Sequence, residues 1–253
     1  MRAIESVHNM QSQMRDWRRE GVTVGFVPTM GALHAGHLAL VERAKRETER
    51  VVVSIFVNPT QFNDPKDLEH YPRPLEKDLT LLSSMNVDGA FLPQAREMYA
   101  DNYNYAVTER ELSRVLCGPT RPGHFAGMLT VVLKLLNVVS ADKAFFGQKD
   151  YQQLKLIQGM ARAFFLPTEI VGCATVRETD GLAMSSRNLM LTAEQRQLAP
   201  EIYKTLKSAR SKEDAVETLT RLGFRVDYVE EHWGRRFAAA FLGNVRLIDN
   251  VEL

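Results

Sequence analysis

Two histidines stand three residues apart in the segment GFVPTMGALHAGHLAL, which runs from Gly25 to Leu40. A strand-like run precedes His34 and a helix-like run follows His37, and neither element needs an imidazole in order to form. Residues i and i+3 at a helix start share a face, so we expect both rings to point the same way. A helix start also offers unpaired backbone N–H groups and a partial positive charge. The pattern therefore predicts a site for an oxyanion that gains charge during a reaction.

The glycines of this segment resemble those of known phosphate sites only in part. Gly31 and Gly36 have P-loop spacing, but His37 and Leu38 follow them in place of Lys and Ser or Thr. The chain also has no GxGxxG fingerprint of dinucleotide binding. The spacing alone leaves open a different kind of phosphate site, or a pair of capping or surface histidines.

A second segment, GQKDYQQ, carries Lys149 and Asp150. We expect it at a junction between a strand and a helix, where a lysine can neutralise a phosphate. The alternative is an aspartate that begins the helix beside a solvated lysine.

A third segment, MSSRN, places the hydroxyl groups of Ser185 and Ser186 beside the guanidinium of Arg187. Such donors can surround a polyphosphate, and arginine can do so in a bidentate manner. The alternative is an ordinary polar loop before a helix, which Thr192 and Gln195 would begin with a capping box.

The elements that must position these residues alternate between strand and helix. Strands are expected at residues 22–27, 50–59, 87–93, 143–147 and 168–176, and helices at 36–49, 73–86, 124–140 and 149–165. Alternation of this kind predicts βαβ units with right-handed crossovers. We therefore expect a doubly wound, Rossmann-like parallel α/β domain. Ligands of such folds bind at the carboxyl ends of the strands, where all three segments fall.

The pattern changes towards the C-terminus. Residues 192–223 predict two helices with charged faces, and residues 224–231 and 235–250 predict short strands with turns at Gly234 and at Gly243. We expect the Rossmann-like domain at residues 1–175 and a small C-terminal α+β domain at residues 176–253. The small domain carries the Ser-Ser-Arg segment, so we expect it to act as a lid.

Bulk composition argues against several classes of protein. The 253 residues include 32 Lys and Arg against 31 Asp and Glu, a balance that gives no general attraction to nucleic acid or to a membrane. The two cysteines, Cys117 and Cys173, have the spacing of neither a disulfide framework nor a zinc site. The charged N-terminus is not a signal peptide, and no apolar run approaches the roughly 18 residues of a membrane span. We expect a cytoplasmic protein without nucleic-acid or membrane partners.

Eight segments, in order along the chain, resemble those of the pantoate–β-alanine ligase family. They are PTMGALHAGH, SIFVNPTQF, YPRPLEKD, RPGHFAGMLTVVLKL, FGQKDYQQ, DGLAMSSRN, LTAEQR and RLIDN. The HxGH motif with a distant Ser-Ser loop is also similar to the HIGH and KMSKS pair of the nucleotidylyltransferase superfamily. One such segment is weak support, whereas eight in order over nearly the whole chain are specific.

The resemblance implies an ATP-dependent ligation in two steps. The pantoate carboxylate attacks the α-phosphorus of ATP to give pantoyl adenylate and pyrophosphate, and the β-alanine amine then releases AMP and pantothenate. The family also implies Mg²⁺ on the phosphates and a homodimer. Metal ligands stay unknown, with Asp78 as a candidate.

Site residues follow from the matching segments. The resemblance implies that His37 is the acid-type catalytic histidine. The other expected catalytic residues are donors or cations that suit the negative charge developing on the phosphates, namely His34, Lys149, Ser185, Ser186 and Arg187. Gln61 and Gln153 match the pantoate-binding glutamines, and Gln61 also borders the β-alanine site. Asn58 and Arg121 lie in segments that line the same cleft. The expected ATP contacts are Met30, Gly31, Ala32, Leu33, His34, Ala35, Gly36, His37, Gly147, Gln148, Lys149, Asp150, Val176, Met184, Ser185, Ser186 and Arg187.

Two other functions stay open. A nucleotidylyltransferase that activates a phosphate would favour an additional basic residue where neutral Gln61 and Gln153 stand. A nucleotide sensor would bind ATP without adenylyl transfer. The chain departs from the family pattern in RNLML and in a short connection before Arg235, both in or near the expected C-terminal domain.

Overall fold

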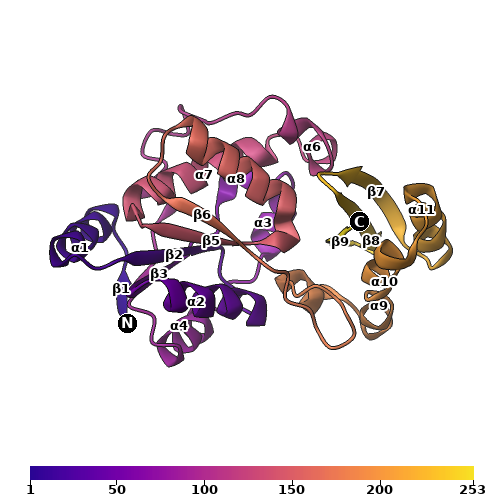
Figure 1. Cartoon of the computed structure of the whole chain (residues 1–253), viewed down its shortest axis with the longest axis horizontal. Coiled ribbons are helices and arrows are strands. Elements are labelled where there is room, and N and C mark those ends of the chain that lie inside the picture. The colour runs from indigo at the N-terminus through magenta and orange to yellow at the C-terminus, as the bar shows by residue number, and fades with distance from the viewer. The chain divides into compact units, whose positions relative to one another are not determined.

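Figure 1 shows the computed structural model, which describes residues 1–253. Contacts divide the chain into two units. The first comprises Met1–Leu33, His37–Gly147 and Gln152–Cys173, and the second comprises His34–Gly36, Gln148–Tyr151 and Ala174–Leu253. The expected domain limits and the lid role remain predictions.

The first unit contains a parallel sheet of six strands in the order β1-β4-β3-β2-β5-β6. The strands are β1 (Arg2–Ile4), β2 (Val24–Thr29), β3 (Arg50–Ile55), β4 (Gly89–Phe91), β5 (Lys143–Gly147) and β6 (Glu169–Cys173). This topology confirms the predicted doubly wound α/β fold. The chain order reverses between neighbouring strands β2 and β5, which makes their carboxyl ends the switch point where such sheets bind ligands.

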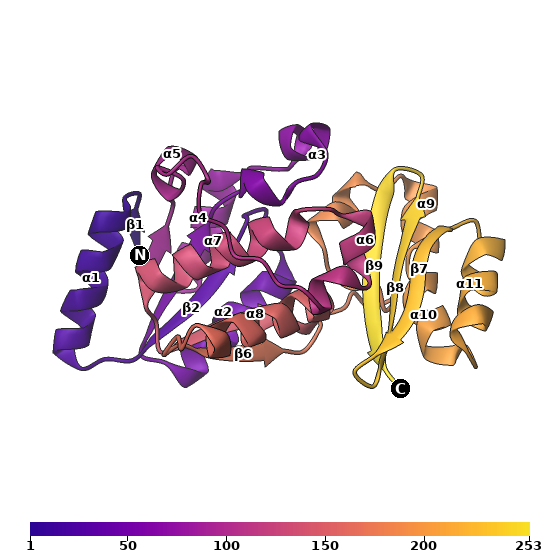
Figure 2. The same cartoon turned by 90° about the horizontal axis from the view of Figure 1, so that it is seen from above.

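Helices cover both faces of this sheet. Helices α7 (His124–Val139) and α8 (Tyr151–Ala163) lie on one face, and α2 (Ala35–Glu47) and α4 (Leu75–Ser84) lie on the other (Figures 1 and 2). The short helices of the connections are η1 (Pro59–Gln61), α3 (Pro65–His70), α5 (Ala95–Met98), η2 (Leu112–Arg114), α6 (Cys117–Thr120) and η3 (Gln148–Asp150). The core under α2 and α4 includes Val27, Val41, Val53 and Leu82, each at most 1% exposed. Burial on both faces explains the unbroken apolar runs of the strands.

Two N-terminal elements were not predicted, β1 and helix α1 (Val7–Glu20). The segment is charged, but Met10, Met14 and Trp17 recur at helical spacing and are buried. Ser6 begins the helix, because its hydroxyl accepts a hydrogen bond from the N–H of Asn9.

The second unit contains an antiparallel sheet of β7 (Arg225–His232), β8 (Arg235–Leu242) and β9 (Val245–Glu252). Its helices are η4 (Ser186–Met190), α9 (Ala193–Leu198), α10 (Glu201–Ser208) and α11 (Lys212–Arg221). The prediction of two helices in residues 192–223 was wrong, because Pro200 has no N–H and separates α9 from α10. The predicted capping box of Thr192 and Gln195 is confirmed.

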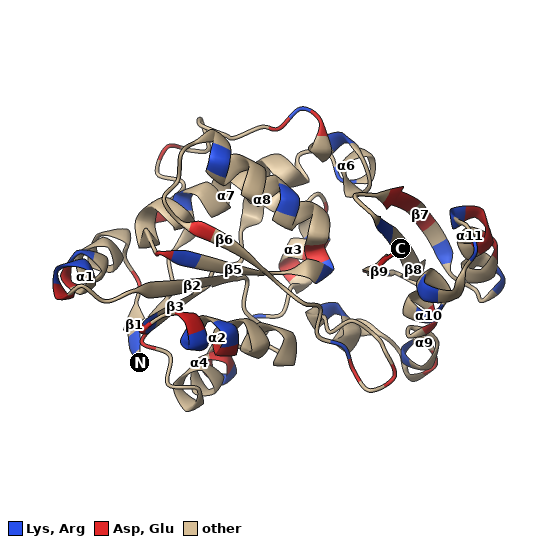
Figure 3. Ribbon diagram, viewed as in Figure 1, with Lys and Arg blue, Asp and Glu red and all other residues tan.

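Charged side chains of both signs are mixed along the surface helices of each unit, as α2 and α11 show in Figure 3. None of the helices combines the length and the apolar character that a bilayer crossing requires.

Candidate active site

The loop after β2 carries the first of the predicted ATP contacts, and Asp78 of α4 fixes its shape. One carboxylate oxygen of Asp78 accepts a hydrogen bond from the N–H of Ala32 and the other accepts one from Leu33, each at 2.8 Å. Asp78 is 1% exposed. Gly31 and Ala32 have φ values of 79° and 51°, so the loop holds two consecutive left-handed residues. The buried carboxylate stabilises this conformation by pairing donors that would otherwise be unpaired.

Asp78 therefore anchors the loop through both oxygens. The chain has no group of three or more His, Cys, Asp or Glu side chains that could hold a metal ion. A role of Asp78 near the phosphates stays a prediction, and the structure gives its carboxylate a backbone role.

Gln61 follows β3 on η1 and lies beside the same loop. Its amide nitrogen contacts the sulfur of Met30 at 3.1 Å, and its amide oxygen accepts a hydrogen bond from Asn58 at 3.1 Å. The structure thus brings together one predicted pantoate-binding residue and one predicted ATP contact. Gln61 is half-buried, and its pantoate-binding role stays a prediction.

Asn58 connects Gln61 to helix α7 through hydrogen bonds. It is 1% exposed, and its amide nitrogen also donates to the carbonyl oxygen of Gly127 at 3.2 Å. Its amide oxygen accepts a hydrogen bond from the hydroxyl of Tyr99. Burial raises the pKa of Tyr99 to about 12, so that hydroxyl remains a donor at neutral pH.

Helix α7 packs directly on η1. The carbonyl oxygen of Gln61 lies 2.8 Å from Nδ1 of His124, and Nε2 of His124 lies 3.0 Å from the guanidinium of Arg121. Arginine can only donate, so Nε2 accepts and Nδ1 carries the proton that is donated to Gln61. A side chain at Gly127 would clash with the backbone of Thr60 and Gln61, so glycine is required for this close packing. His124 and Arg121 thus support Gln61, a role that their sequence positions did not reveal.

Helix α8 carries two consecutive glutamines in different environments. The amide nitrogen of Gln152 donates to the carbonyl oxygens of Leu112 and Val115 at 2.8 and 2.7 Å, and its oxygen accepts from the N–H of Cys117 at 3.2 Å. Gln152 is buried, whereas Gln153 is half-buried. The first glutamine is structural, and the pantoate-binding role of Gln153 stays a prediction.

In the second unit, the structure places His34 near Lys149. Nδ1 of His34 accepts a hydrogen bond from the N–H of Gly36 at 3.1 Å. Burial is the larger cause and the Lys149 cation the second, and together they lower the pKa of His34 to about 4. His34 is therefore neutral at pH 7 with its proton on Nε2, a donor suited to a phosphate oxygen. His37 falls in the first unit, so the expectation of a shared face for the two histidines stays a prediction.

The Ser-Ser-Arg segment belongs to a closed loop of the second unit. The N–H of Met184 donates to the carbonyl oxygen of Val176 at 3.0 Å. The hydroxyl of Ser185 accepts from the N–H of Arg187 at 3.3 Å and so caps η4. Ser186 and Arg187 are half-buried. The capping role of Ser185 matches the alternative interpretation in part, and the roles of Ser186 and Arg187 toward ATP stay predictions.

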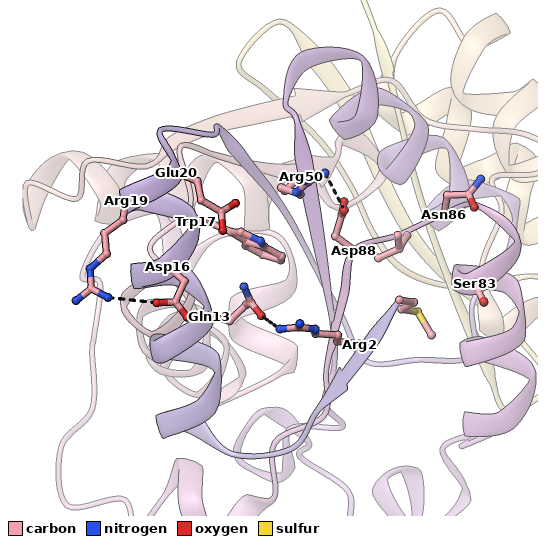
Figure 4. Close-up of a pocket in the computed structure, with 12 residues that line it drawn as sticks. Arg2, Gln13, Asp16, Trp17, Arg19, Glu20, Arg50, Ser83, Asn86 and Asp88 are labelled. Atoms are coloured by element: carbon pink, nitrogen blue, oxygen red, sulfur yellow. Dashed lines mark hydrogen bonds and ion pairs between the residues drawn. The ribbon is translucent and has the colours of Figure 1, made fainter.

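A groove of about 970 Å³ lies elsewhere, at the amino ends of β1, β3 and β4 (Figure 4). None of the predicted site residues lines it. Its three arginines each contact another lining residue: Arg2 donates to Gln13, and Arg19 and Arg50 form ion pairs with Asp16 and Asp88. Its position and pairing give it no part in the chemistry of the motifs.

The fold and these motifs define a nucleotide-binding α/β enzyme of the HxGH type. The sheet is doubly wound, the HxGH loop leaves it at the switch point, and a neutral histidine lies near a lysine. The chain belongs to the pantoate-beta-alanine ligase family, whose family model matches residues 2–252.

Relatives match along the whole chain. It is 56% identical over 243 residues to pantothenate synthetase of Bdellovibrio bacteriovorus, with 96% of this chain and 97% of that protein covered. The identity to pantothenate synthetase of Legionella pneumophila is 48%, with 97% and 98% covered. Among solved structures, pantoate-beta-alanine ligase from Francisella tularensis, complexed with beta-gamma ATP and beta-alanine, matches with a TM-score of 0.95 at 40% identity. That match covers 100% of this chain and 97% of the other.

Proposed function

We propose that this chain joins pantoate to β-alanine with ATP, through a pantoyl-adenylate intermediate, to form pantothenate, AMP and pyrophosphate. The observation that carries the proposal is the family match over residues 2–252, which includes every predicted site segment. The Francisella tularensis ligase is complexed with beta-gamma ATP and beta-alanine, and from these ligands we propose ATP and β-alanine as substrates of this chain.

The reaction has two bond exchanges. An oxygen of the pantoate carboxylate bonds to the α-phosphorus of ATP. The bond between the α-phosphorus and the oxygen that bridges to the β-phosphorus breaks, and pyrophosphate leaves with that electron pair. The β-alanine nitrogen then bonds to the acyl carbon and loses a proton, while AMP leaves with the electrons of the carbon–oxygen bond. Negative charge grows on phosphate oxygens in the first exchange, so donors directed at them are expected to lower the barrier most.

The residues divide between the two exchanges. Neutral His34 and the cation of Lys149 bind and stabilise the phosphates, with Ser185, Ser186 and Arg187 as further donors. His37 is the acid-type histidine of the first exchange. Gln61 and Gln153 bind the pantoate hydroxyl groups by donating and accepting hydrogen bonds, since neutral amides leave the carboxylate free to attack. Gln61 also borders β-alanine. The remaining expected contacts of ATP lie in residues 30–36 and 147–150, with Val176 and Met184.

Mg²⁺, a homodimer and a cytoplasmic location belong to the same proposal. No group of side chains forms a metal cage, so we propose that Mg²⁺ is held mainly by ATP oxygens and water. When bound, it neutralises phosphate charge.

A product assay with the variant His37→Ala tests the proposal. Wild type should form AMP and pantothenate in equal amounts, and only when ATP, pantoate and β-alanine are all present. His37→Ala should lower turnover by about 10²–10³, the usual effect of losing one well-placed donor. His8→Ala on the exposed face of α1 is the control and should retain full turnover. ATP binding without product formation would favour a nucleotide sensor, and full activity of His37→Ala would refute its catalytic role.

A further inference from the structure

Strand β9 contains a buried asparagine, Asn250, whose amide reaches the segment that carries Lys149. Asn250 is 1% exposed. Its amide nitrogen donates to the carbonyl oxygens of Gln148 and Lys149, both at 3.0 Å. These residues stand about a hundred positions upstream in the chain and belong to the same unit.

The orientation of this amide is determined by its partners. Its oxygen accepts a hydrogen bond from Nε of Arg235 at 2.6 Å. Carbonyl oxygens only accept and a guanidinium only donates, so a flipped amide would face two acceptors with its oxygen and a donor with its nitrogen. In the observed orientation the amide oxygen faces a donor and the amide nitrogen faces two acceptors. Both N–H groups of the amide therefore bind the segment that carries Lys149.

Arg235 makes a second contact with the same segment. Its guanidinium lies over the ring of Tyr151, 4.8 Å from the ring centroid. Tyr151 directly follows Asp150, so the sheet of the second unit holds the Lys149 segment at both of its ends. Such contacts order residues that would otherwise lose conformational entropy only when ATP binds.

The neighbouring residue of β9 has a comparable role for the other phosphate loop. Both oxygens of Asp249, which is 2% exposed, pair with the guanidinium of Arg177 at 2.6 and 2.9 Å. Arg177 also donates to the carbonyl oxygen of Gly181 at 3.1 Å, within the loop that leads to Met184. Consecutive strand residues point to opposite faces of a sheet, so two adjacent positions can support two separate loops.

We infer that Asn250 is a positioning residue that acts through Lys149. By holding the carbonyl groups of Gln148 and Lys149, it fixes the backbone from which the Lys149 cation reaches the ATP phosphates and influences His34. This inference rests on the proposed function for the role of Lys149. No role in the site was assigned to the RLIDN segment by its sequence.

A double-mutant cycle tests the inference. Asn250→Ala should lower pantoate-dependent ATP–pyrophosphate exchange by about 10- to 100-fold, the range expected for a misplaced catalytic group. Lys149→Ala should also lower it, and the double variant should resemble Lys149→Ala within about twofold, since residues that act as a unit are not additive. Effects that multiply in the double variant would overturn the inference, because they would mean that Asn250 supports the fold independently of Lys149.

A control variant and a second measurement distinguish a positioning role of Asn250 from a general effect on the fold. Asp227→Asn removes the ion pair with Arg246 on the same sheet, and should leave exchange activity near wild type. Hydrogen exchange in peptides from residues 148–153 should accelerate in Asn250→Ala and not in Asp227→Asn; equal protection in both would overturn the inference. If wild type binds ATP but shows no exchange with pantoate, the proposed function fails, and the same cycle measured as ATP dissociation constants still decides the positioning role.

Discussion

Nδ1 of the His34 imidazole accepts a hydrogen bond from the backbone N–H of Gly36, 3.1 Å away. A nitrogen that accepts cannot carry the proton, so the neutral ring presents Nε2–H. Burial, and then the nearby Lys149 cation, lower the pKa of His34 to about 4. The first histidine of the HxGH motif is therefore an uncharged hydrogen-bond donor at neutral pH, and its protonation begins only at lower pH.

This environment predicts an unusual titration. In nucleotide-free protein, the His34 ring should show no NMR inflection between about pH 5.5 and 8, and its nitrogen shifts should report the Nε2–H tautomer. Because the folded pKa of about 4 lies below the ordinary histidine pKa of 6.5, the unfolded chain binds more protons between these values. The contribution of His34 to the free energy of unfolding is thus present above pH 6.5 and is lost as the pH falls towards 4. His34→Gln should remove that pH-dependent part, and an inflection near pH 6.5 in wild type would contradict the assignment.

Asp78→Asn tests the anchor of the loop after β2, which carries predicted ATP contacts. The variant keeps the size of the side chain but turns an amide donor towards one of the two backbone N–H groups. Leaving such a buried group unpaired costs about 1–3 kcal/mol, and we expect the KM for ATP to rise. The matched control is Asp88→Asn, since Asp88 accepts from the N–H of Val51 at 2.9 Å near the amino end of β3. Stability should fall in both variants, whereas an unchanged KM for ATP in Asp78→Asn would mean that the loop does not need this anchor.

Gly127→Ala tests the packing of α7 against the segment that carries Gln61. The added methyl group would clash with the backbone of Thr60, so η1 must shift. We expect a higher KM for pantoate, with a smaller effect on the KM for ATP. Gly159 of α8 has open space at the corresponding position, and Gly159→Ala should preserve both constants and stabilise the helix by up to about 1 kcal/mol. Equal constants in the two variants would show that η1 does not govern pantoate binding.

The adjacent glutamines of α8 give a direct separation of structure from binding. Gln152→Ala removes the partners of three backbone groups and should destabilise the protein by about 1–3 kcal/mol in denaturant unfolding. Gln153→Ala should leave stability within about 0.5 kcal/mol of wild type and raise the KM for pantoate. If Gln153→Ala bound pantoate normally, the assignment of this residue would be wrong.

The sequence predicted the parts of the fold that depend on local pattern. The apolar runs and helical spacing identified the parallel α/β sheet, and the capping box of Thr192 and Gln195 formed as expected. Helix α1 also had a local signal in Met10, Met14 and Trp17, but the charges around these residues hid it. Strand β1 has only three residues, too few for a period to be recognised.

The supporting residues of the site could not be predicted in this way. Asp78 reaches a loop about 45 residues upstream, and Asn250 reaches one about 100 residues upstream. These contacts depend on which elements become neighbours in the fold. Sequence periodicity does not specify that arrangement. The groups expected to contact substrates had motif spacing, and the groups that hold them in place became evident only in the fold.

ATP–pyrophosphate exchange with Mg²⁺ and pantoate, in the absence of any amine, tests the central claim most directly. Formation of an acyl adenylate is reversible and needs no β-alanine, so labelled pyrophosphate should enter ATP only when pantoate is present. Other small carboxylic acids serve as controls and should support little exchange. Absence of exchange with pantoate, from folded protein that binds ATP, would contradict the adenylate mechanism and leave the HxGH and Ser-Ser-Arg segments as nucleotide-binding elements with another purpose.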